Sequence, residues 1–168
     1  MENLTIRPAA ETDARALIGY LDMVGAESDN LLFGAGGCGF DEAQEARFIA
    51  AMRASSNSCM LLGLDAGEIV SVCTLQGGFR PRIAHRAELA VSVRRSHWRR
   101  GVGTAMLTAL IAQAKRMGLR VIELQVRVDN APAIALYEKM GFEKIGTFAR
   151  FMCVDGVFYD AYLMNLYL

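Results

Sequence analysis

The amino-acid sequence predicts a single α/β domain over residues 1–168, in which a mixed, mostly antiparallel central sheet carries helices on both faces. Strand-like runs alternate with segments of helical periodicity, and no linker, repeat or low-complexity stretch separates them. Residues 87–126 read in turn as a strand, a glycine turn, a helix and a second strand. Such a crossover joins parallel strands with a right-handed connection. A chain of this length buries most of its surface in one core.

The composition narrows the classes of function. Hydrophobic residues make up 53% of the chain and charged residues 21%, which is typical of a globular protein. The formal net charge is zero, and this disfavours a general nucleic-acid-binding surface. No CxxC pair occurs among the cysteines, so we expect free thiols, no metal site and no disulfide framework. Neither a signal peptide nor a membrane-spanning run is present, which predicts a soluble, cytoplasmic protein without a membrane partner.

The first third of the chain is expected to hold a strand, a helix and a long loop. Residues 4–7 alternate as a strand, and Thr12 is placed to cap a helix with one apolar face. Residues 25–40 follow as a loop that contains a GxGxxG sequence. The strand that a dinucleotide fingerprint needs does not precede these glycines, so we reject that interpretation. The loop is either a mobile lid over a substrate or a flexible connection.

Later elements follow from capping and turn residues. Asp41 and Gln44 match a capping box that begins a second helix. A third helix opens within residues 99–104 and ends before Gly118, with its apolar side at Val102, Met106, Ala109, Leu110, Gln113 and Met117. The predicted strands are 59–64, 69–75, 87–93, 121–126, 142–152 and 157–167, with a helix over 130–140. Turn residues at 65–68 and 155–156 predict two hairpins.

The sequence VSVRRSHWRRGVGT, residues 91–104, predicts an anion site. Glycines remove Cβ atoms where a ligand must approach the backbone, and the first N–H groups of a helix have no acceptor within that helix. The positive end of the helix and two arginines add charge, so we expect a pyrophosphate to bind here; an ordinary helix start is the alternative. The expected ligand-binding residues are Arg99, Arg100, Gly101, Val102, Gly103 and Thr104.

A second stretch, NAPAIALYEKMGF at residues 130–142, sharpens this interpretation. Together with WRRGVGT it resembles the two signatures of the GNAT family, the acetyl-CoA-dependent N-acetyltransferases, and the likeness covers about residues 86–168. The resemblance implies the GNAT fold and acetyl-CoA as co-substrate, with its pantetheine arm against the backbones of Val91 and Val93 and touching Asn130. Trp98 stands where the family pattern usually has Gln or Arg.

By the same resemblance, Tyr137 is the general acid that protonates the leaving thiolate. Transfer from a phenol of pKa about 10 to a thiolate of pKa about 8.5 costs roughly 2 kcal/mol, so the role is feasible. The alternative is an amphipathic tyrosine packed in the core beside Leu136 and Met140.

Glu88 is the candidate general base, acting directly or through a water. Alternation puts it on one face of its strand with Ala90 and Ser92, so we expect a carboxylate held inside an otherwise apolar strand. Buried carboxylates are costly and tend to be functional or paired. A salt bridge to Arg86 or a neighbouring arginine is the alternative, and His85 is a weaker candidate base.

Other charged and aromatic residues are assigned to the ligands. We expect an arginine cluster to serve the phosphates of coenzyme A and not a nucleic acid, because the chain as a whole carries no net charge. Its members are Arg80, Arg82, Arg86, Arg94, Arg95, Arg99 and Arg100. In the loop, Glu27 and Asp29 are expected to attract a cationic amine, or else are solvated acids. Tyr159 on the last strand is expected to complete the acceptor pocket, or else to pack in the core.

These features predict an N-acetyltransferase that transfers the acetyl group of acetyl-CoA to a primary amine of a small molecule, such as an amino acid, a polyamine or an amine antibiotic. The amine attacks directly in a ternary complex, since no residue arrangement suggests an acetyl-enzyme. A protein N-terminal or lysine acetyltransferase is one alternative. A non-catalytic acyl-CoA sensor is an alternative of another class. A homodimer is common in families of this kind.

Overall fold

The computed structural model describes residues 4–168, which form seven strands and four α-helices. The strands are β1 (Thr5–Pro8), β2 (Cys59–Asp65), β3 (Glu68–Gly77), β4 (Arg86–Val93), β5 (Val121–Arg127), β6 (Glu143–Val154) and β7 (Val157–Tyr167). The α-helices are α1 (Ala14–Glu27), α2 (Glu42–Ala54), α3 (Val102–Arg116) and α4 (Ala131–Lys139). Three short 3₁₀ helices are η1 (Glu11–Asp13), η2 (Pro81–Ile83) and η3 (Arg95–His97).

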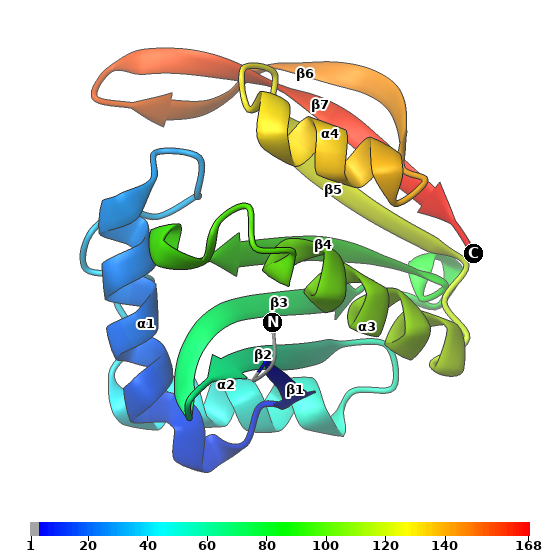
Figure 1. Cartoon of the computed structure of the whole chain (residues 1–168). Coiled ribbons are helices and arrows are strands. Elements are labelled where there is room, and N and C mark those ends of the chain that lie inside the picture. The colour runs from blue at the N-terminus through cyan, green and yellow to red at the C-terminus, as the bar shows by residue number, and fades with distance from the viewer. Residues whose placement is uncertain (1–3) are drawn as a thin grey trace.

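All strands join one sheet in the order β1-β2-β3-β4-β5-β7-β6 (Figure 1). The β4–β5 pair is parallel, as the crossover predicts, and the other pairs are antiparallel. Two apolar clusters lie on opposite faces of this sheet, one under α3 and α4 and the other under α1 and α2. The predicted mixed, mostly antiparallel sheet with helices on both faces is therefore confirmed.

The start of α1 differs from the prediction. Thr12 does not cap the helix, because residues Glu11–Asp13 form η1 and Asp13 directly precedes α1. The Asp13 carboxylate accepts a hydrogen bond from the Ala10 N–H at 2.8 Å and pairs with Arg7 at 2.7 Å. The acid therefore ties this entry to β1, a contact that a local capping pattern does not reveal.

The predicted loop over 25–40 begins too early, because α1 continues to Glu27. Gly25 is buried inside the helix, and a Cβ atom there would lie 2.1 Å from the Gly34 carbonyl oxygen. This glycine permits the returning loop to approach the helix and does not end it. Further along, the Gly36 N–H donates to Asp22 at 2.6 Å, so the glycine-rich segment lies against α1.

The packing of α3 also departs in part from the prediction. Val102, Met106 and Leu110 are buried as expected, but Leu107 and Ala114 complete the buried face. Ala109, Gln113 and Met117 are only half-buried at its margin. The helix packs over β3, β2 and β4. This contact buries Leu107 and Ala114 and leaves Gln113 at the margin of the buried face.

The remaining elements agree closely with the sequence. Asp41 and Gln44 form the predicted capping box at α2. Both predicted hairpins are present, although β3 extends to Gly77 and β4 begins at Arg86. Among residues 4–168, no helix combines the length and apolar character needed to cross a membrane.

Candidate active site

Two neighbouring strands separate at the centre of the sheet. The parallel register of β4 and β5 covers three residue pairs and ends with Glu88 opposite Glu123. Beyond this pair the strands diverge toward the end of the sheet near α1 (Figure 1). The separation exposes main-chain groups of β4 that an ordinary sheet would pair.

Val91 and Val93 lie on the diverging part of β4. The Arg94 N–H donates to the Val70 carbonyl of β3 at 2.9 Å, so strand alternation turns the main-chain groups of Val91 and Val93 toward β5. No residue of β5 is in register with either valine. The Val93 carbonyl accepts a hydrogen bond from the indole Nε1 of Trp98 at 2.7 Å. A ligand between the strands therefore meets free groups at Val91 and shares the Val93 carbonyl with Trp98.

The turn before α3 has an unusual backbone. Arg99 and Gly101 have φ values of 58° and 79°, both left-handed, and Gly101 caps α3 without a side-chain hydrogen bond. The N–H groups of Val102, Gly103 and Thr104 find no acceptor within the part of the chain described. Consecutive N–H groups beside left-handed residues form a concave anion site, and the helix dipole adds positive potential. The local geometry thus fits a phosphate group.

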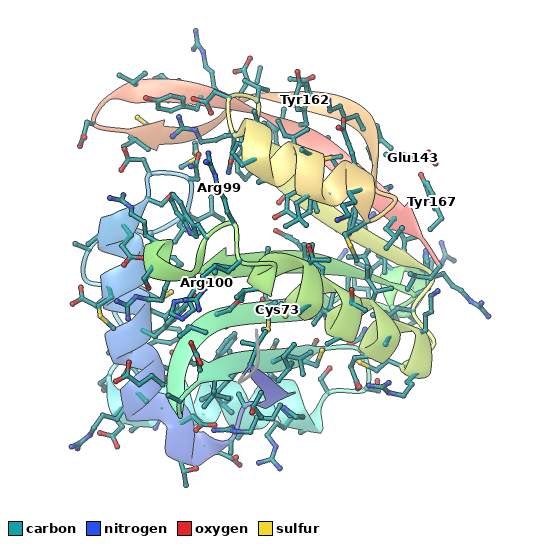
Figure 2. All side chains as sticks on the ribbon, in the orientation of Figure 1. Cys73, Arg99, Arg100, Glu143, Tyr162 and Tyr167 are labelled. Carbon is teal, nitrogen blue, oxygen red and sulfur yellow. The ribbon has the colours of Figure 1, made fainter. Side chains whose placement is uncertain are left out.

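The two arginines of the turn carry free charge. Neither Arg99 nor Arg100 pairs with a carboxylate of the described residues, and both side chains are exposed. In Figure 2 they leave the turn in opposite directions, with Arg99 on the side of α4. Uncompensated guanidinium groups of this kind suit a phosphate-rich ligand.

Gly103 has a packing role in addition. A Cβ atom on Gly103 would lie 3.0 Å from a methyl carbon of Leu136, so the glycine lets α3 approach α4 closely. Asn130 begins α4, and its side-chain oxygen accepts from the Ala133 N–H at 3.4 Å. Its amide NH₂ group has no acceptor among the described residues and remains able to donate to a ligand.

Tyr137 of α4 is 8% exposed and packs edge-on against Phe142. Burial raises its pKa to about 12. Its hydroxyl makes no hydrogen bond with the described residues, and no fully enclosed polar side-chain atom among them lacks a partner, so this hydroxyl keeps some accessible surface. The ring therefore packs in the core while the hydroxyl has no acceptor. Packing in the core is thus compatible with a role as general acid.

The burial predicted for Glu88 is wrong. The side chain is exposed, because neither α1 nor α2 covers this part of the sheet face. Its carboxyl group is nevertheless partly desolvated by the surrounding chain. This desolvation and the nearby Glu123 raise its pKa, while Arg86 lowers it. Arg86 pairs with Glu123, at 3.2 Å, and the alternative interpretation, a salt bridge from an arginine to Glu88, is also absent from the described residues.

Glu88 and Tyr137 lie on opposite faces of the sheet. Leu89 belongs to the same apolar cluster as Tyr137, so its neighbour Glu88 points the other way. The contact of Ser92 with Tyr20 of α1, at 2.9 Å, marks that second face. A reacting group that meets both residues must therefore sit in the plane of the sheet, between the diverging strands.

An open hollow of about 440 Å³ lies at the wide end of the divergence. It is bounded by the end of α1, by the turn after β4 and by β5, through Ala26, Glu27, Ser28, Asp29, Asn30, Arg95, Trp98 and Arg127. The Glu27 carboxylate is already engaged by Arg94 at 3.3 Å and by the Arg95 N–H at 2.7 Å. The Asp29 side chain is exposed and has no ion-pair partner in the described chain.

Sequence reasoning missed Arg127. Its side chain is 9% exposed, stacks on the Tyr159 ring at 3.6 Å and pairs with Asp129 at 2.5 Å. It also donates to the Asp29 carbonyl at 3.1 Å, which links β5 to the loop after α1. Tyr159 thus lies near the hollow and outside the two apolar clusters. Strand alternation along β5 could have indicated it, because alternation places Arg127 on the same polar face as Glu123.

Residues 4–168 bring together no group of three or more His, Cys, Asp or Glu side chains able to hold a metal ion. The assembled features are a glycine turn with unpaired N–H groups, free strand groups, a buried tyrosine and a polar hollow. Arg80 and Arg82 lie on the separate η2 connection.

Comparison with known proteins agrees with this geometry. Residues 26–142 match the family model described as the acetyltransferase (GNAT) family. An L-amino acid N-acetyltransferase of Escherichia coli is 42% identical over 101 residues, which cover 58% of this chain and 61% of that protein. A [ribosomal protein bS18]-alanine N-acetyltransferase of E. coli is 41% identical over 54 residues, or 32% of this chain and 36% of that protein. The chain thus spans less than two thirds of either curated relative.

A solved structure resembles the whole fold. The acetyltransferase of GNAT family from Streptococcus pneumoniae superposes with a TM-score of 0.95 and 29% identity, covering 98% of this chain and 99% of that one. The family model covers well over half of the chain, and the matched segment contains the diverging strands, the glycine turn and Tyr137. The chain therefore belongs to the GNAT family of acetyltransferases.

Proposed function

We propose that this protein transfers the acetyl group of acetyl-CoA to a primary amine of a small molecule. The divergence of β4 and β5 after three residue pairs is the observation that carries the proposal. Beyond those pairs the facing main-chain groups of β4 have no partner on β5. This interval between the two strands, called the slot below, lies next to the turn whose N–H groups lack acceptors. A long ligand with phosphates at one end and amides along its arm complements both features.

In this proposal the turn and its two arginines hold the diphosphate, Val91 and Val93 hold the pantetheine arm, and Asn130 donates to that arm. When bound, acetyl-CoA supplies an acetyl group activated as a thioester. The chain contributes orientation and desolvation, because the slot lies between two packed walls. Free strand N–H groups also offer a donor for a developing oxyanion.

Tyr137 is the proposed proton donor. Its raised pKa, about 12, keeps the phenol protonated at any physiological pH, so it donates and does not act as a base. Against a thiol of unperturbed pKa about 8.5, complete transfer from such a phenol costs about 5 kcal/mol. A thiolate in the same buried slot is also destabilised, and this narrows the difference.

Glu88 is the proposed proton acceptor from the other face. Its exposure suits a base that must return its proton to solvent. Its raised pKa makes it a stronger base than an ordinary glutamate. Deprotonating an α-amine of pKa about 8 at pH 7 costs only about 1.4 kcal/mol, whereas a lysine-like amine costs about 4.6 kcal/mol.

An amino acid is the acceptor we favour. The hollow beside the slot carries both signs of charge, with the Asp29 carboxylate and the Arg95 guanidinium on its walls. A zwitterion offers complementary charges to both. The E. coli relative that is 42% identical is named as an L-amino acid N-acetyltransferase, which supports the same class. Polyamines and amine antibiotics remain within the proposal as cationic acceptors.

A protein N-terminus is the second candidate. The hollow is open to solvent on one side, and another relative is named as a ribosomal-protein alanine acetyltransferase. An N-terminal peptide also presents an α-amine. It lacks the adjacent carboxylate, so the two candidates differ in what they offer to Arg95.

The test is release of free thiol from acetyl-CoA across a panel of L-amino acids, the same amino acids as amides, polyamines, aminoglycosides and short N-terminal peptides. We expect release with amino acids and a loss of at least tenfold in kcat/KM for the amides. Equal rates for acids and amides would favour the peptide acceptor. Binding of coenzyme A without release by any amine would point to a non-catalytic acyl-CoA sensor.

A further inference from the structure

A row of polar side chains crosses the sheet face that carries Glu88. The registers place Gln76 of β3 opposite Glu88, Glu88 opposite Glu123, and Glu123 opposite Asn165 of β7. Asn165 in turn lies opposite Glu143 of β6, which Figure 2 shows at the edge of the molecule. Residues in register share a face, so the row is continuous from β3 to β6.

Glu88 and Glu123 occupy a special position in this row. They form the last pair of the β4–β5 register, at the point where the slot opens. Two carboxylates directly opposite each other on neighbouring strands repel. Gln76, on the other side of Glu88, is neutral and does not offset that repulsion.

Arg86 makes the pair asymmetric. It precedes Glu88 by two residues on the same strand face, but its guanidinium lies 3.2 Å from Glu123 and forms no ion pair with Glu88 in the described chain. Glu123 is the more enclosed carboxylate, with its side chain 24% exposed. The arginine is therefore engaged by Glu123, and Glu88 faces that carboxylate without an ion-pair partner of its own in the described chain.

We propose that Arg86 and Glu123 are positioning residues that set the protonation of Glu88, Glu123 through repulsion by the carboxylate that faces it and Arg86 through attraction from two residues away on the same strand face. The inference rests on the base role of Glu88 in the proposed function. It adds two residues that touch neither substrate and act through Glu88. Desolvation together with repulsion by Glu123 raises the pKa of Glu88, which agrees with the geometry.

The two residues have opposite expected effects. In Glu123→Gln the repulsion disappears and Arg86 becomes free to pair with Glu88, so the pKa of Glu88 falls. In Arg86→Gln the attraction between Arg86 and Glu88 is lost while Glu123 still faces Glu88, so the pKa of Glu88 rises. Each shift is expected to be roughly half a pH unit or more, since both groups are partly solvated.

The experiment follows the carboxyl carbon of Glu88 by NMR during a pH titration of the full chain without ligand, with the signal assigned by Glu88→Gln. Arg47→Gln and Glu68→Gln remove matched charges at exposed positions elsewhere and should leave this titration unchanged. Shifts of opposite sign in Glu123→Gln and Arg86→Gln support the inference. Shifts of the same sign, or none beyond the controls, overturn it.

The catalytic role is separated by activity. If Glu88 is the base, the acid limb of kcat/KM moves down in Glu123→Gln and up in Arg86→Gln by the same amounts as the NMR titration, while KM for acetyl-CoA stays constant. If the titrations move and the acid limb does not, Glu88 is not the base. In that case the base role of Glu88 in the proposed function is refuted, whereas the effect of Arg86 and Glu123 on the pKa of Glu88 is still supported.

Discussion

The two sides of the β4–β5 divergence are built in different ways. On one side, β2 and β3 are buried between α3 and the α1–α2 pair, and most of their residues are inaccessible. On the other side, β6 is exposed along most of its length, and α4 covers one face of β5 and β7. The β2–β3 side is therefore the more fully packed of the two, and the β6 side is the more open.

The largest expected effect comes from Tyr137 of α4, the proposed proton donor. Replacing Tyr137 with Phe should lower kcat by about 10²-fold or more, because general acid catalysis supplies 10²–10⁴-fold. Coenzyme A affinity by calorimetry should remain within about twofold, since the ring still packs on Phe142. The exposed Tyr167→Phe is the matched control. Unchanged turnover in Tyr137→Phe would remove the phenol from the mechanism.

A core substitution on each side tests the comparison itself. Leu110 of α3 is fully buried, so Leu110→Ala should cost about 2–5 kcal/mol in the free energy of unfolding by urea. Ile145 of β6 is 53% exposed, and Ile145→Ala should cost about 0.5 kcal/mol or less. Similar losses at the two positions would mean that β6 is covered in solution, as in a homodimer.

Two glycines with nearly equal φ angles give a matched pair. Gly101 has φ of 79° and Gly156, in the β6–β7 turn, has φ of 81°. A β-branched residue is strained in this conformation, so Gly101→Val and Gly156→Val should each lose about 1–3 kcal/mol of stability. Only Gly101→Val should weaken coenzyme A binding as measured by calorimetry. Equal binding losses in both variants would argue against the phosphate-binding turn.

The smallest expected effect concerns a buried carboxyl group, that of Glu45, on the more fully packed side. Glu45 of α2 is 2% exposed and has no ion-pair partner in the described chain, and burial raises its pKa. A raised folded-state pKa means that the ionised form costs stability. The cost is absent below the ordinary glutamate pKa and grows as the pH rises through the folded-state pKa.

Glu45→Gln should therefore gain stability relative to wild type between pH 4 and pH 7, by less than Leu110→Ala loses. Urea unfolding across that range measures it, with the exposed Glu68→Gln as control. A difference between Glu45→Gln and wild type that does not change with pH would show that the carboxyl is not desolvated.

The comparison also explains which features the sequence could predict. Hairpins, the parallel crossover and the glycine turn follow from local patterns, and all are present. The prediction placed Gly25 in a loop, but it lies inside α1. A side chain is excluded there by the Gly34 carbonyl, which is nine positions away in the sequence. Local propensity cannot report such a contact.

Glu88 shows the corresponding limit for the site. Alternation correctly separates it from Leu89, but whether a strand face is buried depends on which helices cover it. The helices α1 and α2 reach β3 and β2, and the neighbouring face at Glu88 stays open. Arg127 was missed for a similar reason, since its partners come from the loop after α1 and from β7.

The most direct test of the central claim is a crystal structure of the full chain with coenzyme A bound. The account predicts that the diphosphate accepts hydrogen bonds from the N–H groups of Val102, Gly103 and Thr104, that the arm lies between β4 and β5, and that the thiol sulfur is within hydrogen-bonding reach of the Tyr137 hydroxyl. Coenzyme A bound outside the divergence, or with its sulfur facing away from Tyr137, would contradict it.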